Sequence, residues 1–278
     1  MTLVSDAHEG VEETGNGRLR SEWQDVEGCR WHARVSIEPP LAGAPPIVLV
    51  HGLGVSGRYM VPTARRLAPL YPTFLPDLPG FGQSGRPRRP LAVSELADAL
   101  VGWNRAMKLK PVVLLGNSLG CQIVVDIAVR YPEYVTSAVL VGPTGDPRAP
   151  SLPRYAWRLL CDIPRESLSL DLIVAGDYLR AGPRRVLATA RSMVRDPFVE
   201  KLPRVPQPTL VVRGARDPIA PQRWAEEVTR LLPRSRLLVV PGAAHVVNYS
   251  APDALADAVF DLLSNPPSGG PDADIDLR

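Results

Sequence analysis

Residues 112–120 read VVLLGNSLG, four apolar residues followed by a serine between two glycines. The pattern G-x-S-x-G is typical of a sharp turn that leads from a buried strand into a helix and presents the serine hydroxyl above a sheet. Gly116 and Gly120 suit this turn because larger side chains would clash in so tight a bend. A helical spacing of apolar residues follows, in Leu119, Ile123, Ile127 and Tyr131. We therefore predict a strand, a turn at Ser118 and a helix, which a chance Gly-Ser turn would not explain.

A serine hydroxyl becomes a nucleophile when a base accepts its proton, and the base needs an acid that orients it. Of the four histidines, only His245 follows Ser118, in the segment VVPGAAHVV after the last predicted strand, 236–240. In serine hydrolases with this turn, the acid and then the histidine follow the serine in the chain. His245 is therefore the predicted base, and the competing interpretation is a capping or surface histidine.

Two aspartates follow predicted strands and are candidates for the acid. Asp217 lies in VVRGARDPIAP, directly after a strand over 208–213, at the strand end where ligand crevices form in open α/β sheets. Asp146 follows the strand over 135–141 and is the alternative acid. Either aspartate would otherwise belong to an ordinary turn, since Asp-Pro favours turns. We predict that Asp217 orients His245.

A tetrahedral intermediate on the serine needs backbone amides that stabilise its oxyanion. One predicted donor is the amide of Leu119, directly after the serine, and the other is the amide of Leu53 in the loop HGLG. His51, Gly52 and Gly54 complete this loop. We expect His51 to hold the loop in place rather than to act as a second base.

The rest of the chain alternates short apolar strands with amphipathic helices, which is typical of a mostly parallel sheet covered on both faces. Between residues 147 and 206 the pattern changes, because no strand is convincing and helical segments are separated by eight prolines. We predict that 147–206 is a helical insertion between two strands of the sheet. Residues 1–17 and 264–278 are expected to be flexible.

Composition excludes several classes of protein. The 278 residues are 45% hydrophobic, too many for a disordered chain, and the net charge of +3 is too small to indicate a nucleic-acid partner. Three widely spaced cysteines indicate neither a disulfide framework nor a zinc site. The N-terminus lacks the basic start and apolar core of a secretory signal, and no apolar run reaches the ~18 residues of a membrane span. We expect a cytoplasmic protein without membrane insertion, and its oligomeric state stays open.

The motifs HGLG, DLPGFGQSG, GNSLG, ARDPIAP and GAAH stand in the order of the α/β-hydrolase superfamily, which the chain resembles over about residues 30–265. The resemblance implies an eight-stranded, mostly parallel sheet with helices on both faces, formed by residues 18–146 and 207–265. It also implies that residues 147–206 form a helical cap between the sixth and seventh sheet strands. The catalytic triad that it implies is Ser118, Asp217 and His245.

Within the superfamily, the chain is similar to the cap-bearing branch of esterases, cofactor-free haloperoxidases and carbon–carbon bond hydrolases. Haloalkane dehalogenases and epoxide hydrolases share the shape but use an aspartate where this chain has Ser118. Proline iminopeptidases usually have tryptophan after the serine, where this chain has Leu119. The resemblance implies hydrolysis of an ester, or of a related carbonyl or carbon–carbon bond, in a small to medium apolar substrate, without a metal or organic cofactor.

A second motif points to a different class of enzyme. Residues 52–57 read GLGVSG, a G-x-G-x-x-G between a strand and a helix, and Asp77 lies 20 residues beyond Gly57, as in dinucleotide-binding folds. Against an NAD(P)-dependent oxidoreductase, Asp77 opens a PGFG loop, and no tyrosine has a lysine four residues later.

A third hypothesis is a non-catalytic ligand-binding protein on the same fold, which the complete set of triad residues argues against.

Overall fold

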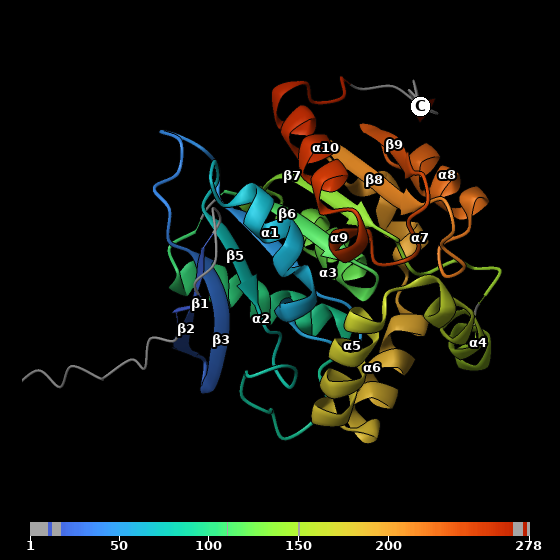
Figure 1. Ribbon diagram of the computed structural model, residues 1–278, viewed down its shortest axis with the longest axis horizontal. Helices are drawn as coiled ribbons and strands as arrows, with labels where there is room; N and C mark the ends of the chain where they lie inside the picture. Colours follow the sequence, from blue (N-terminus) through green and yellow to red (C-terminus); the bar gives the residue numbers. More distant parts are fainter. Residues whose placement is uncertain (1–10, 13–17, 110, 150, 269–274, 277–278) are drawn as a thin grey trace, which may run out of the picture.

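The predicted apolar segments form one twisted sheet with helices on both of its faces (Figure 1). The computed structural model describes residues 11–12, 18–109, 111–149, 151–268 and 275–276. Within these residues the strand order is β1-β2-β3-β5-β4-β6-β7-β8-β9-β10. The strands are β1 (Val11–Glu12), β2 (Leu19–Val26), β3 (Cys29–Ser36), β4 (Ile47–Val50), β5 (Thr73–Pro76), β6 (Val112–Asn117), β7 (Val135–Val141), β8 (Thr209–Gly214), β9 (Ser235–Val240) and β10 (Ile275–Asp276).

The central strands run parallel to one another, from β5 through β4 and β6 to β9, and β2 and β3 join antiparallel at one edge. The strands β2 to β9 confirm the prediction of an eight-stranded, mostly parallel sheet. Two residues of β1 pair with β2, and two residues of β10 pair with β9, in segments that we expected to be flexible. Edge strands have unpaired backbone groups that such short segments can bind. The remaining residues of 1–17, with 269–274 and 277–278, lie outside the described residues.

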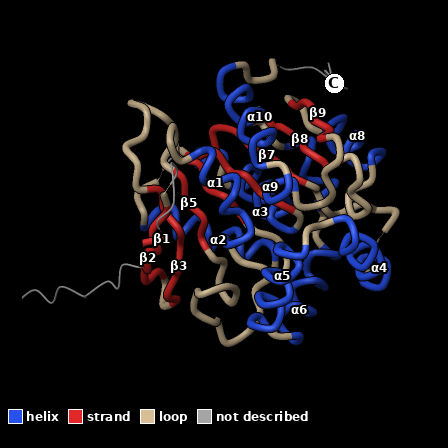
Figure 2. Tube along the Cα trace, in the orientation of Figure 1, coloured by secondary structure: helices blue, strands red, loops and turns tan. Residues whose placement is uncertain are grey.

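Helices cover both faces of the sheet, so the parallel strands are apolar on both sides. Along β6, Val112 and Leu114 belong to the core beneath α2, α3 and α8, whereas Val113 and Leu115 belong to the core beneath α1 and α10. Figure 2 shows these helices around the central strands. The helices of this part of the chain are α1 (Val61–Leu67), α2 (Val93–Ala106), α3 (Leu119–Arg130), α8 (Gln222–Leu231), α9 (Val247–Ser250) and α10 (Pro252–Ser264).

The segment 147–206, here called the insert, lies between β7 and β8, and its described residues are mainly helical. It contains α4 (Leu152–Asp162), α5 (Leu168–Ala181), α6 (Pro183–Arg195) and α7 (Phe198–Lys201). Pro153 and Pro183 stand in the first turns of α4 and α6, where proline's missing N–H costs no hydrogen bond. Figure 1 shows α4, α5 and α6 grouped beside the sheet, next to the strand ends that lead into α3 and α9.

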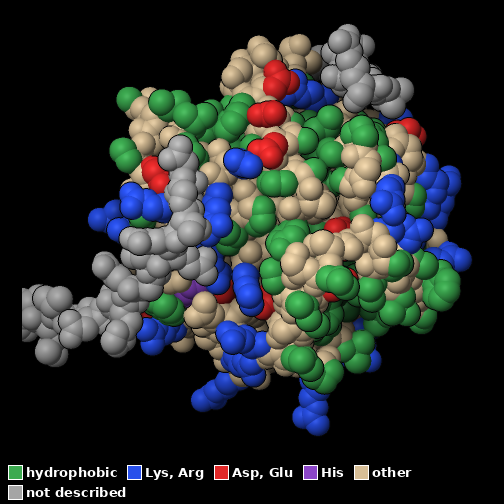
Figure 3. All heavy atoms as spheres, viewed as in Figure 1, with side chains coloured by type: hydrophobic (Ala, Val, Ile, Leu, Met, Phe, Trp, Pro, Cys, Tyr) green, Lys and Arg blue, Asp and Glu red, His purple; other side chains and the backbone are tan. Residues whose placement is uncertain are grey.

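The insert has apolar side chains on its outer surface as well as toward the sheet. On α5, the exposed apolar side chains are Leu168, Leu172 and Leu179. Figure 3 shows hydrophobic side chains gathered over this part of the molecule. The side chains of α5 that line a cavity between the insert and the sheet are Leu170, Asp171, Val174, Ala175 and Tyr178. Among the described residues, no helix combines the length and the apolar character needed to cross a bilayer.

Replacing Gly120 with alanine is expected to destabilise the fold strongly. A Cβ at this position would lie 2.2 Å from the carbonyl oxygen of Val50, a backbone atom of β4 that cannot move without distorting the sheet. We expect Gly120→Ala to lower the free energy of unfolding by about 3 kcal/mol, measured by urea denaturation. Gly176→Ala is the matched control on α5, because a Cβ there meets nothing within 4 Å. The control should be neutral or stabilising by up to about 1 kcal/mol, and equal losses in both variants would contradict the prediction.

Candidate active site

Ser118 lies between β6 and α3 in a backbone conformation that residues other than glycine rarely adopt, with φ 57° and ψ −117°. Its amide donates a hydrogen bond to the carbonyl of Val141 (3.0 Å). Its own carbonyl accepts hydrogen bonds from the amide of Cys121 (3.0 Å) and the hydroxyl of Thr144 (3.2 Å). These bonds hold a strained turn in place, as is common at functional sites, and the serine side chain borders the cavity.

The loop after β4 packs closely against this serine. A Cβ added to Gly52 would lie 3.2 Å from the Cβ of Ser118, a tight contact that glycine avoids. Leu53 lines the cavity, and Leu119 is the first residue of α3, where backbone amides have no partner within the helix. Gly54 has φ 77°, and a Cβ there would lie 2.7 Å from the ring of Tyr178. The two proposed oxyanion donors therefore belong to the loop that packs against Ser118 and to the first residue of α3.

His51 is fully buried and bonded through both ring nitrogens. Its Nε2 accepts a hydrogen bond from the amide of Leu78 (2.9 Å), so its Nδ1 carries the proton and donates to the carbonyl of Gly52 (2.9 Å). Burial lowers the pKa of His51, which favours this neutral form. With no ring nitrogen left for proton transfer, His51 joins the loop to the segment after β5.

His245 and Asp217 form a buried pair on the loops after β9 and β8. The Nδ1 of His245 lies 2.9 Å from Oδ2 of Asp217. Oδ1 of Asp217 accepts hydrogen bonds from the amides of Ile219 (2.7 Å) and Ala220 (2.9 Å), which orient the carboxylate. A Cβ added to Gly142, after β7, would lie 2.8 Å from the His245 ring, so glycine makes room for the pair.

The alternative acid, Asp146, faces a different set of partners. Its carboxylate is bonded to Arg223 (2.6 Å) and Arg158 (3.0 Å) and accepts a hydrogen bond from the amide of Arg148 (3.0 Å). Burial opposes ionisation of Asp146, but these donors hold its pKa below the usual range. Of the two candidate aspartates, Asp217 is the one in contact with His245.

The free nitrogen of His245 faces the cavity that Ser118 also borders. Its Nε2 is buried and has no hydrogen-bond partner among the described residues, and the histidine is 4% exposed. Burial acts to lower the pKa of His245, but the Asp217 carboxylate outweighs it, with smaller contributions from Asp162 and Glu166, so the pKa lies above its ordinary value. The pair Asp217–His245 is therefore arranged to accept and hold a proton on the cavity side.

A hydrogen-bonded chain that the sequence did not reveal connects the three segments of the site. The hydroxyl of Tyr59 accepts from the amide of Gly52 (2.9 Å) and donates to Oδ1 of Asn117 (2.6 Å). Nδ2 of Asn117 donates to the carbonyls of Val141 (3.1 Å) and His245 (3.3 Å). Asn117 stands inside the GNSLG motif and was therefore available as a candidate, whereas Tyr59 had no distinguishing pattern.

The cavity between the insert and the sheet has a volume of about 450 Å³ and a mostly apolar lining. The apolar lining includes Leu53, Val55, Leu159, Ile163, Leu170, Val174, Met193, Ile219 and Val246. Three carboxylates of the insert also border it, Asp162, Glu166 and Asp171. These acids were not among the predicted site residues, because their positions in the insert match no motif.

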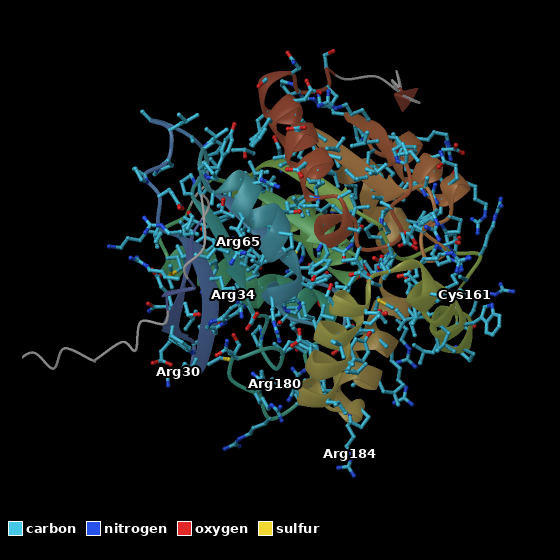
Figure 4. The ribbon with its side chains drawn as sticks, viewed as in Figure 1. Arg30, Arg34, Arg65, Cys161, Arg180 and Arg184 are labelled. Carbon is cyan, nitrogen blue, oxygen red and sulfur yellow. The ribbon has the colours of Figure 1, made fainter. Side chains whose placement is uncertain are left out.

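The carboxylate of Asp77, which the dinucleotide-binding motif required, is fully buried and engaged. Its Oδ1 accepts from the amide of Gly57 (2.8 Å), and its Oδ2 contacts His32 Nδ1 (2.9 Å) and accepts from the amide of Gln83 (2.9 Å). Arg34 of β3, labelled in Figure 4, lies 3.8 Å from the same carboxylate. Asp77 therefore caps the loops around it, and neither oxygen is available for a ribose hydroxyl.

Comparisons with known proteins agree with this fold. The family model described as "Alpha/beta hydrolase family" matches residues 47–258. The chain is 25% identical over 256 residues to 2-(acetamidomethylene)succinate hydrolase of Mesorhizobium japonicum, covering 83% of this chain and 92% of that protein. It is 28% identical over 242 residues to pimeloyl-[acyl-carrier protein] methyl ester esterase of Neisseria meningitidis, covering 78% and 92% respectively.

A solved structure shows the same fold. The thermophilic esterase from Thermogutta terrifontis superposes with a TM-score of 0.74 at 23% identity, over 93% of this chain and 98% of that chain. The family model spans more than half of the chain and includes the segments that carry Ser118, Asp217 and His245. The chain therefore belongs to the alpha/beta hydrolase family, and it is a hydrolase.

Proposed function

We propose that the protein is a serine hydrolase that cleaves an ester bond of a small to medium apolar substrate through Ser118, His245 and Asp217. The observation that carries the proposal is the buried, unpartnered Nε2 of His245 on the cavity that Ser118 borders, with Asp217 on the opposite ring nitrogen. Serine catalysis needs this order of nucleophile, base and orienting acid. The name of the methyl ester esterase supports cleavage of an ester bond, and the name of the 2-(acetamidomethylene)succinate hydrolase supports hydrolysis.

In the proposed reaction, His245 Nε2 accepts the hydroxyl proton as Ser118 Oγ adds to the ester carbonyl carbon. The amides of Leu53 and Leu119 donate hydrogen bonds to the resulting oxyanion, and the N-terminus of α3 adds a favourable dipole. Asp217 keeps the proton on Nδ1 and stabilises the imidazolium. The alcohol then leaves with the proton from His245, and an acyl ester remains on Ser118.

Water completes the proposed cycle. His245 accepts a proton from water as the oxygen adds to the acyl carbonyl, and the proton returns to Ser118 Oγ as the carboxylic acid leaves. The insert acts as the cap in this proposal, because its side chains supply much of the cavity wall opposite the sheet. Their apolar character favours an apolar acyl or alkyl chain next to the reacting carbonyl.

The pH profile of ester hydrolysis tests the proposed base. The reaction needs neutral His245, and the neighbouring carboxylates raise the pKa of this histidine above the ordinary value of 6.5. We therefore expect hydrolysis of short p-nitrophenyl esters, with kcat/KM lost as the pH falls through a midpoint above 6.5, followed in a pH-stat. A midpoint below 6.5, or a flat profile, would contradict this assignment. A vinylogous diketone in the same panel separates ester hydrolysis from carbon–carbon cleavage by the same residues.

A further inference from the structure

Two carboxylates of the insert meet the loop that carries His245. Asp162 is the last residue of α4, and Glu166 lies four residues later, just before α5. Both line the cavity that Ser118 and His245 also border. Oε1 of Glu166 accepts a hydrogen bond from the amide of Val246 (2.8 Å), which holds this part of the insert against the His245 loop.

One oxygen of each of these two carboxylates lacks a partner. Oδ1 of Asp162 and Oε2 of Glu166 are buried, and neither has a hydrogen-bond partner among the described residues. Asp162 is 4% exposed. A buried carboxylate oxygen without a donor is costly, and native structures rarely leave one unsatisfied without a function. The cavity therefore contains two acceptors that a bound molecule can satisfy.

The electrostatics of the cavity favour a cation over an anion. Asp171 adds a third carboxylate to the lining, and no lysine or arginine belongs to the lining described for this cavity. His245 can carry a positive charge at the cavity, but it is paired with Asp217. Burial raises the pKa of Asp162 to about 6, with a smaller raising effect from Asp217, while His245 acts to lower it. Asp162 is therefore mainly ionised above neutral pH, and its attraction to His245 and to Arg165, which lies outside the cavity lining, does not cancel the effect of burial.

We propose that Asp162 and Glu166 form a binding subsite for an ammonium or protonated amine group on the substrate. The proposal rests on the proposed function, since it assigns a substrate class to the same cavity. Two N–H donors of the ligand's ammonium group would satisfy the two unpartnered oxygens, and its positive charge would offset theirs. A carboxylate at this place would meet three like charges, so the subsite disfavours anionic substrates.

Calorimetric titration of three ligands with the same chain length tests the subsite at pH 7.5. The ligands are hexylammonium, hexan-1-ol and hexanoate. We expect hexylammonium to bind at least about tenfold more tightly than hexan-1-ol, and hexanoate to bind most weakly. Hexylammonium should also inhibit hydrolysis of p-nitrophenyl butyrate competitively, which places it in this cavity. Equal affinities of the three ligands, or no binding of any, would overturn the proposal.

Variants identify which carboxylates cause the preference for hexylammonium. Asp162→Asn combined with Glu166→Gln removes both charges with little change of shape, and the preference for hexylammonium should fall below about threefold. Glu200→Gln, at an exposed carboxylate on α7, removes a charge from the insert and should keep the preference. A preference that survives the double substitution would overturn the proposal. If the double variant no longer binds hexan-1-ol, the two single variants are titrated instead. Retention of the preference for hexylammonium in both single variants would overturn the proposal.

The binding readout separates this proposal from the proposed function. The titrations are repeated on Ser118→Ala, where turnover plays no part. Selective binding of hexylammonium without ester hydrolysis by the wild type would support the subsite and contradict the hydrolase proposal. Ester hydrolysis without selectivity among the three ligands would support the hydrolase proposal and contradict the subsite.

Discussion

Ser118→Ala is expected to lower kcat for p-nitrophenyl butyrate by about 10³-fold or more. Alanine removes the oxygen that forms the acyl intermediate and leaves the rest of the turn intact. The backbone of residue 118 has a positive φ and is held by three hydrogen bonds, none of which uses the side chain. The variant should therefore fold and keep the cavity, and its residual rate should reflect only binding and the oxyanion donors. Steady-state kinetics against the wild type measure the loss.

The control is the same substitution at Ser264, the last residue of α10, whose hydroxyl is exposed and bonded to the carbonyl of Phe260. Ser264→Ala should keep the wild-type kcat. A fluorophosphonate probe gives a second readout that does not depend on the choice of ester. It should label the wild type and Ser264→Ala but neither Ser118→Ala nor His245→Ala, which lacks the base. Undiminished hydrolysis or labelling in Ser118→Ala would show that another residue is the nucleophile.

Asp217→Asn is expected to lower kcat by about 10²- to 10⁴-fold. Oδ2 of Asp217 lies 2.9 Å from Nδ1 of His245, and the carboxylate stabilises the imidazolium that forms when Ser118 loses its proton. An amide in its place carries no charge, and its NH2 group can bind His245 in the wrong tautomer. Comparing the two proteins on the high-pH plateau of kcat at saturating ester, where His245 is neutral in both, separates this effect from a simple shift in the pKa of His245.

Asp146→Asn is the matched control, because Asp146 is equally buried but contacts Arg223 and Arg158 instead of His245. We expect Asp146→Asn to keep kcat within about threefold of the wild type and to lose thermal stability, since its two arginines lose their ionised partner. The opposite ranking, with a large loss of kcat only in Asp146→Asn, would exchange the roles of the two aspartates.

Local patterns were sufficient for most of the sheet and its helices. The apolar run before Ser118 and the helical spacing after it depend on neighbours in sequence, and they form β6 and α3 as predicted. The two-residue strands β1 and β10 had no such signal, because they are strands only through pairing with the edges of β2 and β9. A segment of two residues is too short to show any periodicity of its own.

The motif over residues 52–57 shows the limit of local reasoning. Its glycines and its distance to Asp77 fit a dinucleotide site in the sequence. In the folded chain, Gly57 donates its amide to Asp77, and His32 from β3 contacts the same carboxylate. The spacing that suggested ribose binding thus reflects a hydrogen bond between Gly57 and Asp77 within the protein. The sequence could not show this, because the contact of Asp77 with His32 joins residues 45 positions apart.

The strand, turn and helix around Ser118 could be predicted from sequence alone, because a tight turn of this kind requires particular residues next to the serine. The pairing of His245 with Asp217 was predicted from the order of the residues along the chain, but Asp146 also follows a strand, and only the packing of β8 beside β9 brings Asp217 within 2.9 Å of the His245 ring. Asp162 and Glu166 were not predicted, because an acidic residue in or next to a helix has no functional pattern until folding buries one of its carboxylate oxygens without a partner. Strands, helices and tight turns depend mainly on residues that are neighbours in sequence. The contacts and solvation of a side chain depend on segments that meet only in the folded protein.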